Sequence, residues 1–418
     1  MTSNADLFLG VGSAALDQWI STLYGMPQLQ GSLFSGSTTQ SIAGIGDDVI
    51  LDWTVTQTPT VTLADPGPLW QQAIGVTGAP PTPVPNAFTV SLPALTLTIQ
   101  VNGSPPQSAT IAPTGLVQAT LSGSNVSIAP VGAVVDLNGL SENQQTIYRY
   151  LVIPTVLQIV HGLLGGYAIP QLSPLGVALS APALAVGNGL LLVAMNLGAT
   201  VPATPSLDTL PPDPVFLLAS AAAAQAFVNA GVQQIANTTK SVGGSEGFTL
   251  ANASYNASLS LGAVTVQLDP ADLTRATALV QLSASASAQA TALFLSASIG
   301  YDASISPSPV PLSIQISASG SNVLATVSPP PPVSIGLTPT GDISSIILSG
   351  IAWPLASVIV NLLQPLADQL LVANNPYAVV TIPQTTQSIN GVPVTITVNV
   401  VTVEMFGQML KVGGTLTL

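Results

Sequence analysis

Stretches of alternating apolar and polar residues run along much of the chain and predict β-strands. From Leu282 to Ala292, "LSASASAQATA" alternates without interruption, as a strand with one buried face does. The alternation continues to Tyr301 in the opposite phase. "FTVSLPALTLTIQV", residues 88–101, also changes phase, and we expect a bulge or bend at Pro93. Long strands with a change of phase predict strongly curved sheets.

Two long apolar segments, residues 142–164 and 343–371, predict helices that are buried over most of their surface. Residues 346–367 carry no charge and are long enough to cross a bilayer. They also contain Pro354 and Pro365, and strand-like sequence flanks both segments. This favours core helices and leaves a membrane-inserting segment as an alternative.

Shorter helices are predicted at residues 6–24 and 215–236, and closing strands at 189–197 and 407–418. The two sets have the same order, and sequence matches link them. "SGSNV" occurs at residues 122–126 and 319–323, and "FLGVGSAALDQWI" from Phe8 resembles "FLLASAAAAQAFV" from Phe216. The matches recur in the same order at an offset of about 200 residues, which is the size of a domain. We therefore expect two modules, residues 1–205 and 206–418, joined by a Pro-rich linker at 203–214.

The composition excludes several classes of function. The net charge is −13, from 17 acidic residues against four bases, and the chain has no cysteine. Nucleic acid is not expected as a partner, because phosphate binding needs clustered Lys and Arg. The same shortage excludes a polybasic membrane patch, and the lack of cysteine excludes a disulfide scaffold.

The first residues, "MTSNADLFLGVGSAALDQ", lack the basic region of a signal peptide and include Asp6 and Asp17. We expect an extracellular protein exported without an N-terminal signal peptide, and a cytoplasmic location is the alternative. The acidic, Cys-free composition resembles that of substrates of bacterial type I secretion.

The order of helix, curved antiparallel sheet, long apolar helix and strand, present twice, resembles the tubular lipid-binding (TULIP) superfamily. The resemblance is greatest to its two-module members, which include bactericidal/permeability-increasing protein and clostridial toxin-cluster proteins. It covers the whole chain and includes the "IVHGLL" and "IVNLLQ" helices, which contain His161 and Asn361. Animal members are often basic and carry a disulfide. This chain has neither property, so their cationic binding of lipopolysaccharide is not carried over.

The resemblance implies an α+β fold of two tandem modules in an elongated, boomerang-like molecule, each with a sheet wrapped around its long helix. It also implies an apolar slot for acyl chains, so that a lipid or fatty-acyl ligand is the expected partner. Burying a methylene group is worth about 0.8 kcal/mol, which makes such a slot an effective lipid site. The residues that we expect to line the slots are apolar residues of the long helices and facing strands: Leu97, Ile99, Leu151, Val156, Ile159, Val160, Leu163, Leu293, Leu295, Ile299, Trp353, Val358, Ile359, Leu362, Leu363 and Leu366.

No set of residues predicts catalysis, a cofactor or a metal site. "GGSEG" at residues 243–247 fits a nucleophile elbow, but the only histidine, His161, precedes it, and we expect a polar loop there. We expect His161 to be a hydrogen-bonded core residue. "GVGSAA" from Gly10 fits a dinucleotide motif without the acidic residue that should follow. Asp47, Asp48 and Asp52 match no EF-hand spacing and predict a solvated turn.

We therefore predict a non-enzymatic protein that binds and carries lipids or other hydrophobic ligands, with transient membrane contact. A second interpretation is a structural or adhesive exoprotein, or a component of a secreted toxin complex with a protein partner and no bound lipid. The nearly uncharged surface, rich in Ser, Thr and Asn, motivates it.

Overall fold

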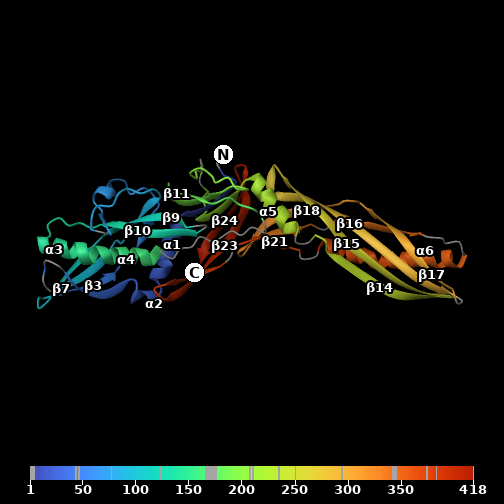
Figure 1. Cartoon of the computed structure of the whole chain (residues 1–418), viewed down its shortest axis with the longest axis horizontal. Helices are drawn as coiled ribbons and strands as arrows, with labels where there is room; N and C mark the ends of the chain where they lie inside the picture. Colours follow the sequence, from blue (N-terminus) through green and yellow to red (C-terminus); the bar gives the residue numbers. More distant parts are fainter. Residues whose placement is uncertain are drawn as a thin grey trace.

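The computed structural model describes residues 5–42, 45, 48–76, 78–122, 125–164, 177–206, 209, 211–233, 236–249, 251–292, 295–328, 330–340, 346–372, 375–382 and 384–417. They form an elongated, bowed molecule built from curved sheets and a few helices (Figure 1). Every strand pair in the described ranges is antiparallel. The predicted α+β class and the elongated, bent shape are confirmed.

A seven-stranded sheet lies in the middle of the molecule and takes strands from both halves of the chain. Its order is β11 (Ala183–Gly187), β12 (Leu190–Met195), β1 (Leu7–Gly12), β13 (Val215–Ala219), β24 (Met409–Thr417), β23 (Val392–Phe406) and β22 (Thr385–Ile389). β1 and β13 pair at its centre, with Leu7 opposite Ala219. The division at residue 205 stays a prediction, and the sheet joins strands from both sides of it.

Two sheets form the rest of the first half. One contains β2 (Ser35–Ser41), β3 (Asp48–Val55), β7 (Leu95–Val101) and β8 (Gln107–Ile111), in that order. The other contains β4 (Thr60–Thr62), β6 (Ala87–Ser91), β9 (Thr114–Ser122), β10 (Asn125–Val134) and β5 (Ile74–Gly75). The bend expected at Pro93 is instead a break between strands, because β6 and β7 belong to different sheets.

A single large sheet dominates the second half. It contains β14 (Thr239–Phe248), β15 (Ala251–Asp269), β16 (Asp272–Ala292), β18 (Val310–Ser319), β19 (Asn322–Val327) and β21 (Tyr377–Thr381), with β17 (Leu295–Ser306) and β20 (Ser334–Thr340) branching from β16. The phase change near residue 294 was expected inside one strand, and this is wrong. β16 and β17 are separate strands that pair with each other, Ala292 opposite Leu295.

The helices cover the sheets. They are α1 (Ser13–Tyr24), α2 (Pro27–Gln30), a 3₁₀ turn (Gly67–Gln71), α3 (Glu142–Ile147), a π-helical turn (Tyr148–Val152), α4 (Ile153–Leu164), α5 (Ala221–Gln233) and α6 (Ile346–Leu371). The helices predicted from residues 6 and 215 begin later than expected, because β1 and β13 precede them. These strands are buried on both faces, so their continuous apolar sequence has no period that distinguishes strand from helix.

The repeated sequences occupy repeated structures. β1 and α1 recur as β13 and α5 at the offset of the Phe8 and Phe216 match. The two "SGSNV" motifs lie at the turns of β9–β10 and β18–β19. In both hairpins the motif's first serine pairs with its asparagine, Ser122 with Asn125 and Ser319 with Asn322. The expected duplication is therefore present in the topology as well as in the sequence.

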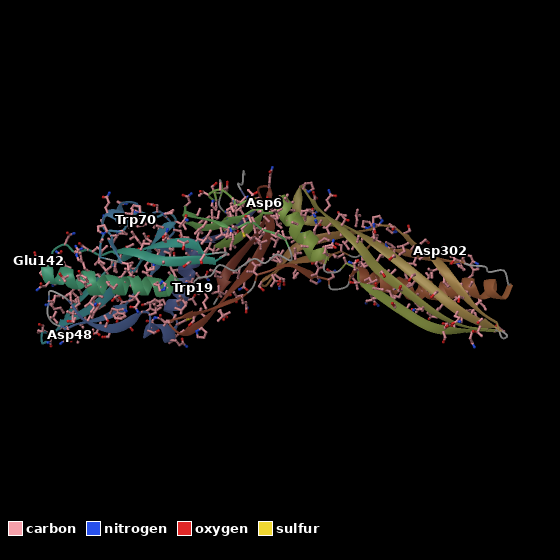
Figure 2. The ribbon with its side chains drawn as sticks, in the orientation of Figure 1. Asp6, Trp19, Asp48, Trp70, Glu142 and Asp302 are labelled. Carbon is pink, nitrogen blue, oxygen red and sulfur yellow. The ribbon has the colours of Figure 1, made fainter. Side chains whose placement is uncertain are left out.

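Polar contacts stabilise the central sheet, and the one between Ser220 and Asp6 joins the two halves. The carboxylate of Asp6, labelled in Figure 2, accepts hydrogen bonds from the Leu197 backbone N–H and the Ser220 hydroxyl. Lys411, only 2% exposed, forms ion pairs with Asp213 and Glu404. Burial lowers the pKa of Lys411, but hydrogen bonds to these two carboxylates outweigh it, so that the pKa lies above its ordinary value.

Gly10, from the dinucleotide-like motif, has a packing role. A Cβ atom at this position would lie 2.1 Å from the ring of Phe216. Only glycine lets β1 accommodate this ring in the central sheet. Close packing therefore accounts for the glycine without a nucleotide.

Candidate functional site

A cavity of about 480 Å³ lies between β7–β8 and α3, at the outer end of the first half. We call it the tip cavity. In Figure 1 it is at the end of the molecule that carries the labels α3 and β7. Its volume falls within the usual range of small-molecule sites.

The sheet side of the tip cavity comes from β7, β8 and their turn. Register places Leu97 opposite Ala109 and Ile99 opposite Gln107. Because side chains alternate along a strand, Leu97, Ile99 and Val101 all face the cavity. The remaining residues on this side are Ser104, Pro105, Gln107, Ser108 and Ala109.

The helix side is fixed by a capping box at the start of α3. The Gln144 side chain accepts from the Ser141 backbone N–H at 2.9 Å, and the Gln144 N–H donates to the Ser141 hydroxyl at 3.4 Å. This holds the first turn in place against the strands. The residues on this side are Leu140, Ser141, Asn143, Gln144, Ile147 and Tyr148.

A π-helical turn follows α3 and carries Tyr148. The Ile153 N–H donates to the carbonyl of Tyr148, five residues earlier. Pro154 comes next, has no N–H, and would clash with the Tyr150 carbonyl in a regular α-turn. The wider turn accommodates the proline and lets α4 continue.

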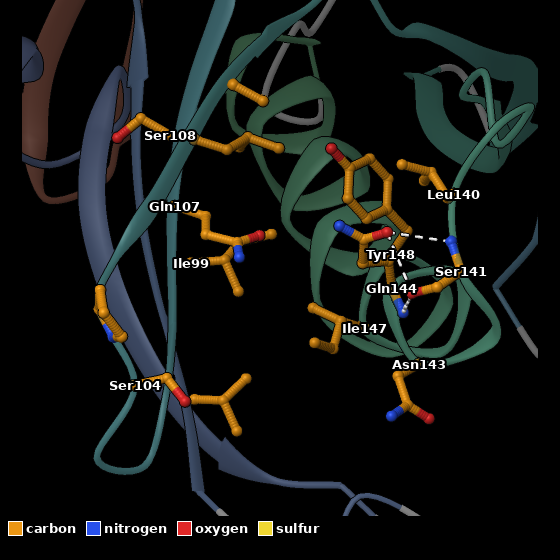
Figure 3. A pocket seen from close by; sticks show the side chains of 14 residues that line it. Ile99, Ser104, Gln107, Ser108, Leu140, Ser141, Asn143, Gln144, Ile147 and Tyr148 are labelled. Carbon is orange, nitrogen blue, oxygen red and sulfur yellow. Dashed lines mark hydrogen bonds between the residues drawn. The ribbon is translucent and has the colours of Figure 1, made fainter.

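The walls of the tip cavity are apolar or uncharged. Figure 3 shows Ile99, Ile147 and Tyr148 facing the cavity, with Gln107 and Gln144 on opposite sides. Burial raises the pKa of Tyr148, so its hydroxyl keeps its proton and stays a hydrogen-bond donor. Asp48 and Glu142 lie at the same end of the molecule (Figure 2), but neither lines the cavity. The cavity therefore matches an apolar ligand with an uncharged polar group.

Of the residues expected to line a slot in the first half, Leu97 and Ile99 lie in the tip cavity. The others fill the core. Each is 2% exposed or less, and they are Leu151, Val156, Ile159, Val160 and Leu163. α4 lies close to β9 because Gly115 has no side chain. A Cβ there would lie 2.8 Å from a methyl group of Val160.

The residues expected to line a slot in the second half differ in how far they are buried. Ile299, Ile359 and Leu363 are buried, whereas Val358, Leu362 and Leu366 are partly buried. Trp353 does not face inward and is 57% exposed. Leu295 begins β17, and Leu293 lies outside the described residues. Whether these positions bind a ligand stays a prediction.

Sequence reasoning missed the whole helix side of the tip cavity. The sequence does contain a feature that indicates it: "SENQ", residues 141–144, is a capping box that marks where the helix begins. Tyr148, an aromatic residue with a polar end inside an apolar helix, is a second signal.

Two expectations about polar residues are wrong. His161 is exposed on α4 instead of hydrogen-bonded in the core, because successive helix residues point in different directions and Ile159 and Val160 take the buried ones. Residues 243–247 form part of strand β14 and not a loop, since they pair along β15.

The aspartates expected in a turn are also placed differently. Asp48 and Asp52 lie on β3, and Asp47 lies outside the described residues. Within the described ranges, no cluster of His, Asp and Glu is arranged to hold a metal ion.

Both long helices are apolar enough to span a membrane by length and composition alone. In Glu142–Leu164, 67% of the most apolar window is buried inside the protein, compared with 39% in Gly350–Leu371. The first is a core helix, as expected. The second has a larger exposed face.

Comparison with known proteins shows similarity in structure but none in sequence. No family model and no curated protein matches the chain. A lipopolysaccharide binding protein matches with 11% identity over 99% of both chains and a TM-score of 0.31. P47 from Clostridium botulinum A2 matches with 9% identity over 99% of this chain and 97% of its own, TM-score 0.39. P47 of Clostridium botulinum E1 matches with 8% identity over all of both chains, TM-score 0.38.

Proposed function

We propose that the protein binds a lipid or other single-chain hydrophobic ligand in the tip cavity, and that it is not an enzyme. The observation that carries the proposal is the open space between β7–β8 and the start of the long helix. Elsewhere along α4, the same side of the helix is filled by buried aliphatic residues. The tip is therefore where an acyl chain has room to enter.

The chemistry of the walls defines the ligand. An acyl chain gains about 0.8 kcal/mol for each methylene group that it buries against residues such as Ile99 and Ile147. Tyr148, Gln107 and Gln144 supply hydrogen-bonding groups, and no residue of the lining is charged. A neutral headgroup such as that of a monoacylglycerol fits better than a charged one, because a charge would lose its hydration without a partner.

Native mass spectrometry, followed by organic extraction, tests the proposal. We expect co-purifying or added monoacylglycerol to bind in a defined ratio. Ala109→Trp fills the cavity from β8 and should weaken binding at least tenfold. The matched control is Ala378→Trp, also an exposed alanine on an edge strand, which should leave binding unchanged.

Two results would overturn the proposal. One is a chain that binds no added single-chain lipid. The other is equal binding by the Ala109→Trp variant and the natural chain. The first result would favour a structural or adhesive exoprotein, which has a filled core and no ligand.

A further inference from the structure

A second concavity, of about 260 Å³, lies on the outer side of α4, where the helix passes β5 and β10. We call it the α4 groove. It shares no lining residue with the tip cavity. Gly75, Val76 and Pro130 form one wall, and the helix forms the other.

The helix wall is built around one stripe of residues, flanked by the exposed Pro154 and Gln158. Arg149, Ile153, Leu157 and His161 follow one another at intervals of four residues, which places them on one face of the helix. Arg149 and His161 are exposed, whereas Ile153 and Leu157 are buried beneath the groove. At 1.5 Å per residue the stripe is roughly 18 Å long. The stripe thus has an apolar centre, with a cation at one end and an imidazole at the other.

These two polar side chains are unusual in this chain. The chain has four Lys and Arg residues and one His, and Arg149 is the first base in the sequence. The other bases have partners: Arg275 pairs with Asp272, Lys411 with Asp213 and Glu404, and Lys240 with Gln369. Within the described ranges, Arg149 and His161 have no hydrogen-bond or ion-pair partner, and no carboxylate lines the groove.

Val76 completes the site from the opposite wall. It is 67% exposed, which is unusual for an aliphatic side chain, and it lines the groove together with Ile153 and Leu157. A ligand on Ile153 and Leu157 would cover it. Guanidinium groups bind carboxylate and phosphate oxygens in pairs of hydrogen bonds, so the groove has complementary chemistry for both ends of an amphiphile.

We infer that the α4 groove binds a single-chain anionic amphiphile, with its carboxylate or phosphate headgroup on Arg149 and its alkyl chain against Ile153, Leu157 and Val76. This goes beyond the proposed function, because the tip cavity is uncharged and suits a neutral headgroup. The protein then has two lipid sites in its first half that differ in headgroup selectivity.

Calorimetric titration with matched ligands tests the inference: dodecanoate and dodecyl phosphate below their micelle concentrations, dodecanol below its solubility limit, and acetate. Both anionic amphiphiles should bind roughly tenfold more tightly than dodecanol, as one charge-assisted pair of hydrogen bonds allows. Arg149→Gln should abolish that advantage, whereas Arg275→Gln, at an exposed arginine of the other half, should keep it. With the tip cavity blocked by Ala109→Trp, Val76→Ser should weaken every alkyl ligand several-fold.

The two lipid sites are tested separately. Ala109→Trp blocks the tip cavity and should leave the advantage of dodecanoate over dodecanol intact. In the Ala109→Trp variant, dodecanoate that binds no better than dodecanol would overturn the inference, and so would an added Arg149→Gln substitution that keeps the difference. Acetate that binds as tightly as dodecanoate would also overturn it, because the groove would then hold an anion without its chain.

Discussion

The two halves share their order of elements but enclose their long helices differently. In the first half, α4 lies between two sheets whose strands have at most ten residues. In the second half, α6 packs on one sheet whose strands β15 and β16 have 19 and 21 residues. Long strands reach further along a helix, but a single sheet covers fewer of its sides. The same order of elements thus gives a helix enclosed on two sides in one half and a helix with an exposed face in the other.

Close contacts account for the tighter packing around α4 in the first half. Gly115 lets β9 approach Val160, and Gly162 lets α4 approach Leu33. Trp19 of α1 is buried against the end of α4 and donates a hydrogen bond to the Leu163 carbonyl at 3.2 Å. These contacts lie near the end of α4, whereas the tip cavity lies at the opposite end of the long helical segment, at the first turn of α3.

Substitution at Trp19 should have the largest effect. Trp19→Ala should lower the free energy of unfolding by about 3–5 kcal/mol, because it leaves a large cavity and removes the bond to Leu163. Phe227, the matching residue of the repeat, is 6% exposed and has no side-chain polar group. Phe227→Ala should therefore cost less. Urea unfolding followed by circular dichroism measures both.

Hydrogen exchange then localises the effect of the two variants. Trp19→Ala should raise exchange in residues 142–164, and Phe227→Ala should raise it around α5. Gln18→Ala, at the exposed neighbour of Trp19, should change stability by no more than about 0.5 kcal/mol. An equal or larger loss in Phe227→Ala would contradict the idea that the first half is the more tightly packed.

Much of the fold could be predicted from the sequence, and the parts that could not be predicted have physical causes. The duplication, the long helices and the alternating strands follow from repeat and period. β1 and β13 could not be recognised as strands, because "LFLGVG" and "VFLLA" are apolar throughout. Leu97 and Ile99 were assigned to a ligand wall, but Gln107 and Gln144 depend on how β8 and α3 meet across space. His161 was placed in the core because its neighbours are apolar, and the helix turns it outward.

Alkaline pH should lower the stability of the second half, and we expect this effect to be smaller than that of Trp19→Ala. Tyr301 is 7% exposed and donates to the Ala352 carbonyl of α6 at 3.2 Å. Burial raises its pKa from 10.0 to about 12, and it raises the pKa of Tyr377 to about 12 as well. Between these values the unfolded chain loses the proton first. The stability contributed by these protonated tyrosines is therefore complete below pH 10.0 and is lost as pH rises toward about 12.

Thermal melts at successive pH values measure this loss. Tyr301→Phe should cost about 1 kcal/mol at neutral pH, where it removes the bond to Ala352, and should make the alkaline loss shallower. Hydrogen exchange should locate the alkaline opening in α6 and β17. An alkaline transition that is unchanged in Tyr301→Phe and Tyr377→Phe would show that other groups control it.

The smallest effect on stability should come from Trp353, on the exposed face of α6. Trp353→Ser should change the free energy of unfolding by no more than about 0.5 kcal/mol, because the side chain is already 57% exposed. Ile351→Ala, two residues earlier on the buried face, should cost about 2–5 kcal/mol. Of the chain's four tryptophans, Trp353 should also contribute most of the fluorescence that acrylamide quenches. A large loss of stability in Trp353→Ser would instead place this side chain inside the second half, as the sequence led us to expect, and would make the two helices alike.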